Sequence, residues 1–239
     1  MASTLNVNRI GSKVSTLTIG EAGGDTVLDG NTLRADILKD SGGNVIFQSD
    51  GAGTVSNVNS GFGSSMVLIL SQPFTDETTV SFTSGITSTY GEYIFKFYNI
   101  GPATDQVNFT FQTSTDGGSN YNLTVTNTYF RASHTEADAT NLTYDTGADD
   151  AQGTAFMSLA EGLGNDADEN TAGELHLFNP SSTTYVKHYI GKFSSGEFSP
   201  GAYNTFSAGY FNTTSDIDAI QFKMSSGNFD GTIKMFGIK

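Results

Sequence analysis

The distribution of aromatic residues constrains the fold of this chain more than any other feature. The sequence contains 18 Phe and 10 Tyr in 239 residues, but residues 1–60 contain one aromatic residue, Phe47. A segment with so few large apolar side chains cannot offset its chain entropy by burial within one chain. We therefore expect three parts: an N-terminal segment at 1–56, a Gly- and Ser-rich linker at 57–65, and a C-terminal head at 66–239.

The N-terminal segment contains short runs such as "TLNVNRI", "KVSTLTIG" and "NVIFQSDG", which alternate apolar and polar residues and stop at Gly. Two interpretations are open: the segment is disordered, or identical chains wind together and supply the missing faces. The regular alternation of Val, Leu and Ile favours the second interpretation. We expect a thin, intertwined, trimeric β-stem with Ile37, Val45, Phe47 and Val55 as its core.

The head has the alternating pattern of antiparallel strands. In "VNFTFQTS" and "IDAIQFKM" apolar and polar residues alternate, which predicts strands that are buried on one face. The inward positions of these two strands are Val107, Phe109, Phe111, Ile220, Phe222 and Met224. Roughly ten such runs, separated by turn residues, predict an all-β head, a β-sandwich of the jelly-roll type. For 154–163, "TAFMSLAEGL", a short helix and a strand are both open.

Charge and composition exclude several classes of protein. The net charge of −14 and the pI of about 4.3 disfavour binding to nucleic acid or to anionic lipid. The absence of Cys excludes disulfides, thiol catalysis and cysteine-ligated metal sites. The start, "MASTLNVNRIGSK", lacks the apolar region of a secretion signal, and no run approaches the length of a membrane span. We expect no membrane insertion.

Carboxylates dominate residues 136–174, because no Lys or Arg lies between Arg131 and Lys187. Solvated surface loops are the expected structure, and 131–172 is the largest candidate for a binding loop. Within "NDADEN", Asp166 and Asp168 alternate as hard oxygen ligands suited to Ca²⁺. The segment lacks the Gly and Glu spacing of an EF-hand. Asp166 and Asp168 are nevertheless the metal candidates that the sequence offers.

The sequence contains no catalytic signature. It has no G-x-S-x-G elbow, no P-loop and no G-x-G-x-x-G, and its three histidines have no metal-binding spacing. Paired carboxylates could serve glycoside hydrolysis, but acidic loops are far commoner than active sites. We therefore expect no enzyme activity and no organic cofactor.

Tyrosines near turns are the candidates for ligand recognition. An exposed Tyr can stack on a sugar while its hydroxyl forms hydrogen bonds. Tyr121, Tyr144 and Tyr203 lie beside predicted turns and are therefore possible glycan contacts. The alternative is that these rings close the ends of the sandwich.

Both halves of the sequence resemble one family. "LNVNRIGSKVSTLTIGEAGGDTVLDG" and "DSGGNVIFQSDGAGTV" are similar to the stems of marine bacteriophage fibre-type virion proteins. "STYGEYIFKFYNI" and "GELHLFNPSSTTYVKHY" are similar to the heads of structural proteins from such phages. The resemblance brings no catalytic residues.

The resemblance implies a homotrimeric fibre in the virion, made in the host cytoplasm and found on the extracellular particle. Its N-terminal segment would contact other virion proteins, and its head would bind a host surface glycan or protein. A capsid decoration or head-fibre protein is the alternative, and a glycan-degrading enzyme is a third class.

Overall fold

The computed structural model describes residues 37–40, 42–49, 52, 55–56, 58 and 65–239. The chain divides into two compact units, Met1–Gly63 and Ser64–Lys239, and the expected linker at 57–65 spans this division. The strand-like runs expected before Ile37 lie outside the described residues. The all-β prediction is confirmed, since the described residues form strands and turns and no helix.

The first unit contains a three-stranded antiparallel sheet of β1 (Ile37–Lys39), β2 (Val45–Ser49) and β3 (Val55–Ser56), in that order. The turn between β1 and β2 is held by Asp40. Its Oδ1 accepts hydrogen bonds from the backbone N–H groups of Gly42 and Asn44 at 2.9 and 2.8 Å. Gly43 has a φ of 83°, which glycine adopts without strain.

The register of this sheet divides the expected stem residues between two faces. Phe47 pairs with Leu38, and Val55 pairs with Ser49, so Leu38, Val45, Phe47 and Val55 share one face. Ile37 pairs with Gln48 and lies on the opposite face. Among its described residues the unit has no fully buried side chain, and Ile37 and Val55 are 43% and 54% exposed.

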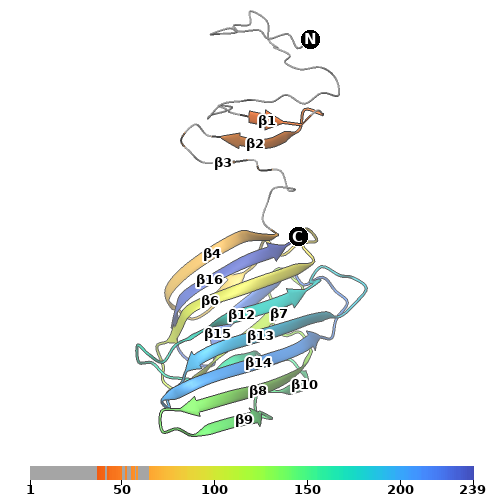
Figure 1. Cartoon of the computed structure of the whole chain (residues 1–239). Coiled ribbons are helices and arrows are strands. Elements are labelled where there is room, and N and C mark those ends of the chain that lie inside the picture. Colours follow the sequence, from red (N-terminus) through yellow and green to blue (C-terminus); the bar gives the residue numbers. More distant parts are fainter. Residues whose placement is uncertain (1–36, 41, 50–51, 53–54, 57, 59–64) are drawn as a thin grey trace, which may run out of the picture. The chain divides into compact units, whose positions relative to one another are not determined.

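The second unit consists of two antiparallel sheets. The larger sheet contains β4 (Met66–Glu77), β6 (Glu92–Pro102), β8 (Val125–Thr135), β9 (Thr140–Tyr144), β10 (Asp150–Gly153), β12 (Thr171–Phe178), β13 (Lys187–Gly196), β14 (Gly201–Phe211) and β16 (Phe229–Ile238). Its order is β10-β8-β14-β13-β12-β6-β16-β4, and β9 also pairs with β8 (Figure 1).

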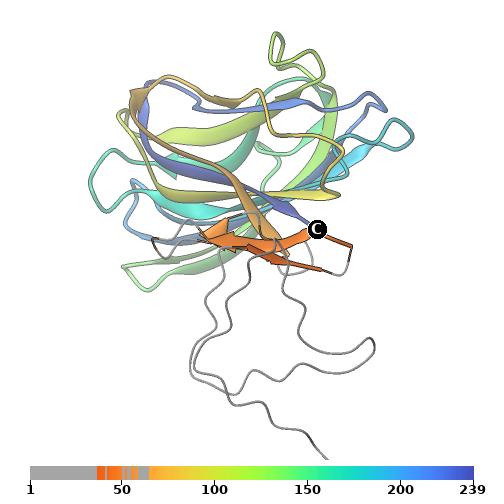
Figure 2. The same cartoon turned by 90° about the horizontal axis from the view of Figure 1, so that it is seen from above.

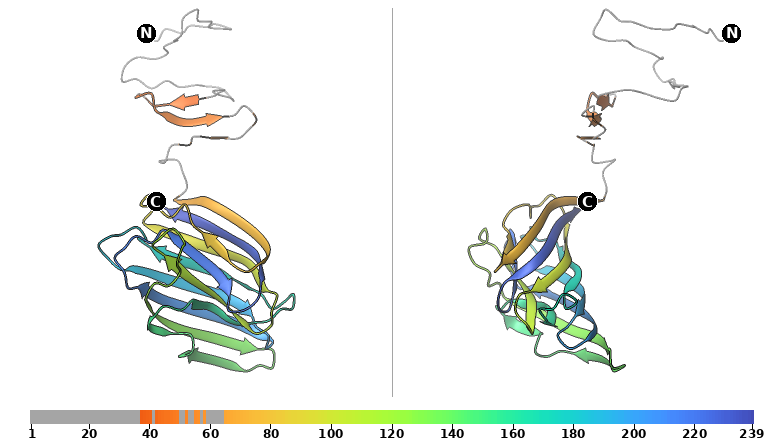
Figure 3. Two further views of the ribbon diagram at one scale, coloured as in Figure 1. Left: turned by 180° about the vertical axis from the view of Figure 1, so that it is seen from behind. Right: turned by 90° about the vertical axis from the view of Figure 1, so that its left-hand side faces the viewer.

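The smaller sheet has four strands in the order β11-β7-β15-β5. They are β5 (Val80–Phe82), β7 (Val107–Ser114), β11 (Met157–Leu163) and β15 (Ala219–Met224). It lies behind the larger sheet in Figure 1, and the reverse view in Figure 3 brings it forward. Figure 2 shows the same two layers from above.

The core lies between the two sheets and is rich in aromatic rings. Phe97 of β6 packs against Phe222 of β15, with ring centroids 5.0 Å apart, and against Phe109 of β7 at 5.4 Å. All six inward positions predicted for β7 and β15 are buried, so that prediction is confirmed.

The second face of β7 differs from the prediction. Thr110 and Gln112 were expected to face solvent, but both are buried. The Gln112 side-chain N–H group donates to the carbonyls of Leu123 and Ala155 at 3.1 and 3.0 Å. The segments that precede β8 and β11 therefore cover this face and satisfy the polar group that they bury.

The acidic region is not the long loop that its composition predicts. Residues 131–172 contain the end of β8, the strands β9, β10 and β11, and the start of β12. Segment 154–163, open between helix and strand from the sequence, contains β11, which pairs with β7. Pairing with a sheet edge overrides the helical propensity of this segment.

In the part of the chain that the structure describes, no helix has the length and apolar character that a membrane span requires.

Candidate binding face

The larger sheet has one face on the core and one face turned away from the smaller sheet, which we call the outer face. Side chains alternate between the two along each strand. On β6, for example, Phe95 and Phe97 enter the core, while Lys96 between them lies on the outer face.

Cross-strand pairing aligns one outer-face residue from each of seven adjacent strands, and we call this line the central row. From β16 to β9, through β6, β12, β13, β14 and β8, it consists of Lys234, Lys96, Glu174, Lys192, Phe206, Phe130 and Tyr144. Three cations thus stand at one end of the row and three aromatic residues at the other.

The lysines of the row contact one carboxylate and two rings. Lys96 Nζ lies 3.3 Å from Glu174 Oε2. Lys192 Nζ lies 5.5 Å from the ring centroid of Phe206, and Lys234 Nζ lies 5.1 Å from that of Tyr98. Partial burial opposes ionisation of Glu174, but Lys96 and His176 hold its pKa below the ordinary value. The π face of an aromatic ring attracts a cation in such a position.

The aromatic end of the row exposes flat apolar surface. Phe130 and Phe206 stack with centroids 5.0 Å apart and an interplanar angle of 12°. Phe130 is 41% exposed, and Tyr144 beyond it is 50% exposed. The Tyr144 hydroxyl donates to Asp149 Oδ2 at 2.7 Å, and this bond raises the pKa of the tyrosine. An oriented, exposed ring of this kind can stack on a ligand.

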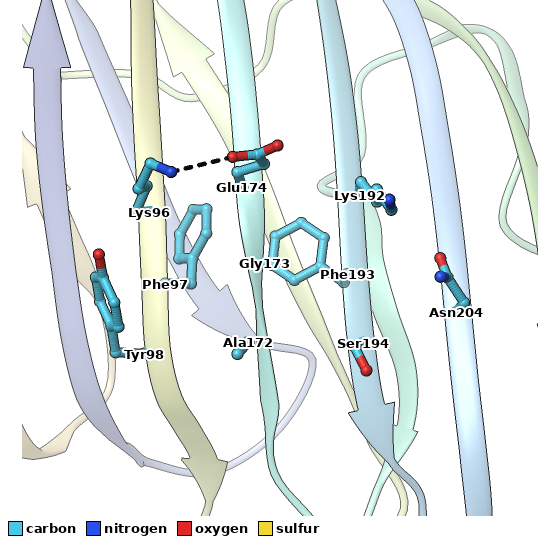
Figure 4. A pocket seen from close by; sticks show the side chains of 10 residues that line it. All are labelled: Lys96, Phe97, Tyr98, Ala172, Gly173, Glu174, Lys192, Phe193, Ser194 and Asn204. Atoms are coloured by element: carbon cyan, nitrogen blue, oxygen red, sulfur yellow. Dashed lines mark hydrogen bonds and ion pairs between the residues drawn. The ribbon is translucent and has the colours of Figure 1, made fainter. Parts of the chain in front are cut away.

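A shallow depression with a volume of about 340 Å³ lies beside the row. In Figure 4, Lys96 and Tyr98 stand on one side, Lys192 and Asn204 on the other, and Ala172 lies on the strand between them. The side-chain oxygen of Asn204 has no hydrogen-bond partner among the described residues. The depression exists because the residues of β12 at this point are small, and longer side chains on the neighbouring strands form its sides.

The close approach of β12 and β13 beneath the depression requires glycine at position 173. A Cβ added at Gly173 would lie 2.4 Å from the carbonyl oxygen of Lys192 and 2.6 Å from the ring of Phe193. Both distances are well inside van der Waals contact, so the floor of the depression depends on this residue.

The three tyrosines predicted as ligand contacts have different surroundings. Tyr144 belongs to the central row and offers an exposed ring. Tyr203 is 8% exposed, and the Arg131 guanidinium lies 5.8 Å from its ring centroid, so it has no free face for a ligand. The Tyr121 hydroxyl is buried and without a hydrogen-bond partner among the described residues. For Tyr203 the prediction of an exposed contact is wrong, because β14 turns this side chain inward.

Asp166 and Asp168 do not gain the further ligands that a calcium site needs. The backbone N–H of Glu169 donates to the Asp166 carbonyl at 3.0 Å, and the Glu169 carboxylate accepts from the Asp166 N–H at 3.2 Å. The segment thus folds as a turn. Nowhere in the described ranges do three or more His, Asp or Glu side chains gather as a metal site would require.

A partly buried acidic cluster, not foreseen from the sequence, lies on the other side of the larger sheet. Arg131 Nη1 lies 3.2 Å from Glu197 Oε1, and Arg131 Nε lies 3.8 Å from Asp145 Oδ2. Burial raises the pKa of Glu197 to about 7, and burial also raises the pKa of Glu161 nearby. Arg131 thus pairs with two carboxylates from separate segments, and its charge opposes the rise in the pKa of Glu161.

The central row is likewise invisible in the sequence, because its members lie on seven strands and only the register aligns them. Tyr144 was the one member predicted as a ligand contact. No model of a known protein family matches the chain, and neither a curated protein nor a solved structure is significantly similar to it.

Proposed function

We propose that this chain is a fibre-type structural protein of a phage virion. Its N-terminal segment attaches a trimer to the particle, and its head binds a host surface through the outer face of the larger sheet. The observation that carries the proposal is the strand order of the head. Strands inserted into this order carry an exposed lysine and exposed rings on the outer face.

The strand order supports a jelly-roll head. Eight strands form two facing sets, β4-β16-β6-β12 in the larger sheet and β5-β15-β7-β11 in the smaller sheet. Along the chain, successive strands of this set cross between the sheets at every step except from β7 to β11. This alternation supports assigning the head to the double-sheet jelly rolls, an architecture used by viral capsid and lectin domains.

Two insertions in this scheme build most of the candidate binding face. The strands β8, β9 and β10 lie between β7 and β11, and the strands β13 and β14 lie between β12 and β15. Both sets extend the larger sheet beyond β12. They carry Lys192 and the three aromatic residues of the central row. The additions to the framework therefore supply part of the recognition surface, as expected of a function grafted onto a common fold.

The described part of the first unit supports a shared stem. Leu38, Val45, Phe47 and Val55 line one face of its small sheet, and none of them is fully buried within one chain. Three copies would bury this face around a common axis and supply the apolar burial that one copy lacks. The sequence predicted Ile37 on this apolar face, but Leu38 lies there instead.

Deletion of residues 1–56 tests the attachment. We expect the shortened protein to keep the circular dichroism spectrum and thermal transition of a folded head. We expect it to be missing from purified virions, whereas the full-length chain is incorporated. Incorporation of the shortened protein would contradict N-terminal attachment. Quantitative mass spectrometry of the same particles gives the copy number, and one copy per capsomer would favour the decoration protein.

A further inference from the structure

We propose that the ligand of the outer face is an anionic polysaccharide, a sugar chain that carries carboxylate or sulfate groups. Lys96, Lys192 and Lys234 would hold the anionic groups, and the rings of Tyr98 and Phe206 would support the sugars. The inference rests on the proposed function, in which this face is the recognition surface of the head.

The first argument is the placement of charge. The chain has 25 Asp and Glu against 11 Lys and Arg, yet three lysines and one carboxylate make up the charged part of the central row. Lys96 and Lys234 are directly opposite each other on adjacent strands. Like charges in this arrangement repel and destabilise a sheet. An anionic group bound between them would relieve the repulsion, since Glu174 forms an ion pair with Lys96 and, among the described residues, none with Lys234.

Second, two of the lysines lie over aromatic rings, the exposed Tyr98 and the half-buried Phe206. Lys234 lies over Tyr98, and Lys192 lies over Phe206, so each ring has a lysine within 5.5 Å of its centroid. A sugar that stacks on such a ring places its charged substituent near the ammonium group. Three strand spacings separate β6 from β14, roughly 14 Å at the usual distance between strands. This length accommodates several sugar units in one bound chain.

The third argument is the shape of the surface between the rings. The depression lies between Tyr98 and Asn204, and Ser194 adds a hydroxyl to its lining. Sugar recognition requires hydrogen-bonding groups beside apolar platforms, and the exposed Ser194 hydroxyl supplies one here. The site is open along the sheet. A polymer requires such an open site, because it extends beyond the residues that bind it.

A single-stranded nucleic acid has the same two features, aromatic bases and negative charge. The observations favour the sugar, because successive bases need open ring faces, whereas Lys192 and Phe130 already contact the ring of Phe206.

The test is equilibrium binding of the full-length protein to three sugar polymers and one nucleic acid. Alginate provides carboxylates, heparin provides sulfates, dextran is neutral, and oligo(dT) is the nucleic acid. We expect binding to alginate, heparin or both, with weaker binding at high salt. The triple variant K96Q/K192Q/K234Q should lose at least about tenfold in affinity, since it removes three charge-assisted contacts.

Lys223 provides the matched control. Its Nζ lies 4.0 Å from the ring centroid of Phe156, so it is also a lysine over a ring, but it belongs to the smaller sheet. We expect K223Q to bind as the wild type does, and Phe206→Leu to weaken binding with the melting temperature unchanged. Equal loss in K223Q, equal binding to dextran, or tighter binding to oligo(dT) would overturn the proposal.

The two proposals fail in different ways. A protein that is found in virions but binds neither alginate nor heparin refutes the ligand and leaves the fibre role. A protein that binds a polyanion through the three lysines but is absent from virions refutes the fibre role and leaves the ligand.

Discussion

Burial of the Glu197 carboxylate makes the stability of the head depend on pH. Its side chain is 5% exposed, and burial raises its pKa from the ordinary 4.5 to about 7, although Arg131 opposes the shift. The folded state therefore binds the proton more tightly than the unfolded state does. The stability that this group contributes is fully present below pH 4.5 and is lost as the pH rises through about 7.

We predict that Glu197→Gln reduces the loss of stability between pH 5 and pH 8. The amide cannot ionise, and its oxygen can still accept a hydrogen bond from Arg131. The difference between variant and wild type should change by on the order of 2 kcal/mol across this range. Urea denaturation at the two pH values measures it, with the exposed Glu77→Gln as control. Equal pH slopes in Glu197→Gln and wild type would contradict the prediction.

Gly173 is the second residue with a specific steric role. We predict that Gly173→Val destabilises the head by about 1–3 kcal/mol, because β12 and β13 must separate to accept a Cβ there. The neighbouring Ala172 is exposed on the outer face, so Ala172→Val should be nearly neutral. Thermal denaturation of both variants distinguishes the two positions. If Gly173→Val does not lower the melting temperature, β12 and β13 are not close enough at this position to exclude a side chain.

At the scale of elements, the sequence predicts which residues of a single strand face the core. It does not predict which strands pair or which segments cover them. The inward positions of β7 and β15 follow from period-two patterns that any half-buried strand shows. Burial of Gln112 could not be predicted, because the covering segments come from elsewhere in the chain. The acidic composition of 131–172 concealed β9 and β10, since edge strands tolerate polar residues.

The candidate site was less predictable than the fold. Lys96, Lys192 and Lys234 are separated by long stretches of chain, and nothing local to any of them predicts that they share a row. Their alignment requires the order β16-β6-β12-β13, which depends on the packing of the whole head. Tyr144 was predicted because a Tyr beside a turn is a local feature.

Packing between the two sheets yields a prediction at this scale. Phe222 of β15 contacts rings of both sheets, Phe95 and Phe97 of β6 among them, at centroid distances of 5.5 and 5.0 Å. We predict that Phe222→Ala costs about 3–5 kcal/mol of unfolding free energy, through lost burial and the cavity left behind. Chemical denaturation measures this loss.

Phe130→Ala is the matched control for this core substitution. Phe130 stacks on Phe206 on the outer face and is 41% exposed, so its removal should cost far less. Similar losses in Phe222→Ala and Phe130→Ala would mean that the core between the sheets does not dominate stability.

At the scale of the whole molecule, the chain joins two units of different composition. The head buries a dense aromatic core and keeps one sheet face open. The small sheet of the first unit buries none of its described side chains fully. The proposed fibre would account for both facts, because other copies would complete its stem and its head would bind a host surface.

The sheet of the first unit also predicts which residue a trimer depends on. Phe47 is its one aromatic side chain and shares a face with Leu38, Val45 and Val55. We predict that Phe47→Asp prevents trimer formation and leaves the melting temperature of the head unchanged, since a buried charge at the axis has no partner. Lys39→Asp, a charge change on the same unit at an exposed position, is the control. A trimeric Phe47→Asp protein would place the contacts between copies elsewhere.

The most direct test of the account is the molar mass of the full-length protein in solution, measured by light scattering after size-exclusion chromatography. One chain has a mass of 25.3 kDa, and we predict three times this value at micromolar concentration. The protein without residues 1–56 should return to the mass of a single chain. A full-length protein that remains monomeric and folded at that concentration would contradict the shared stem and, with it, the fibre.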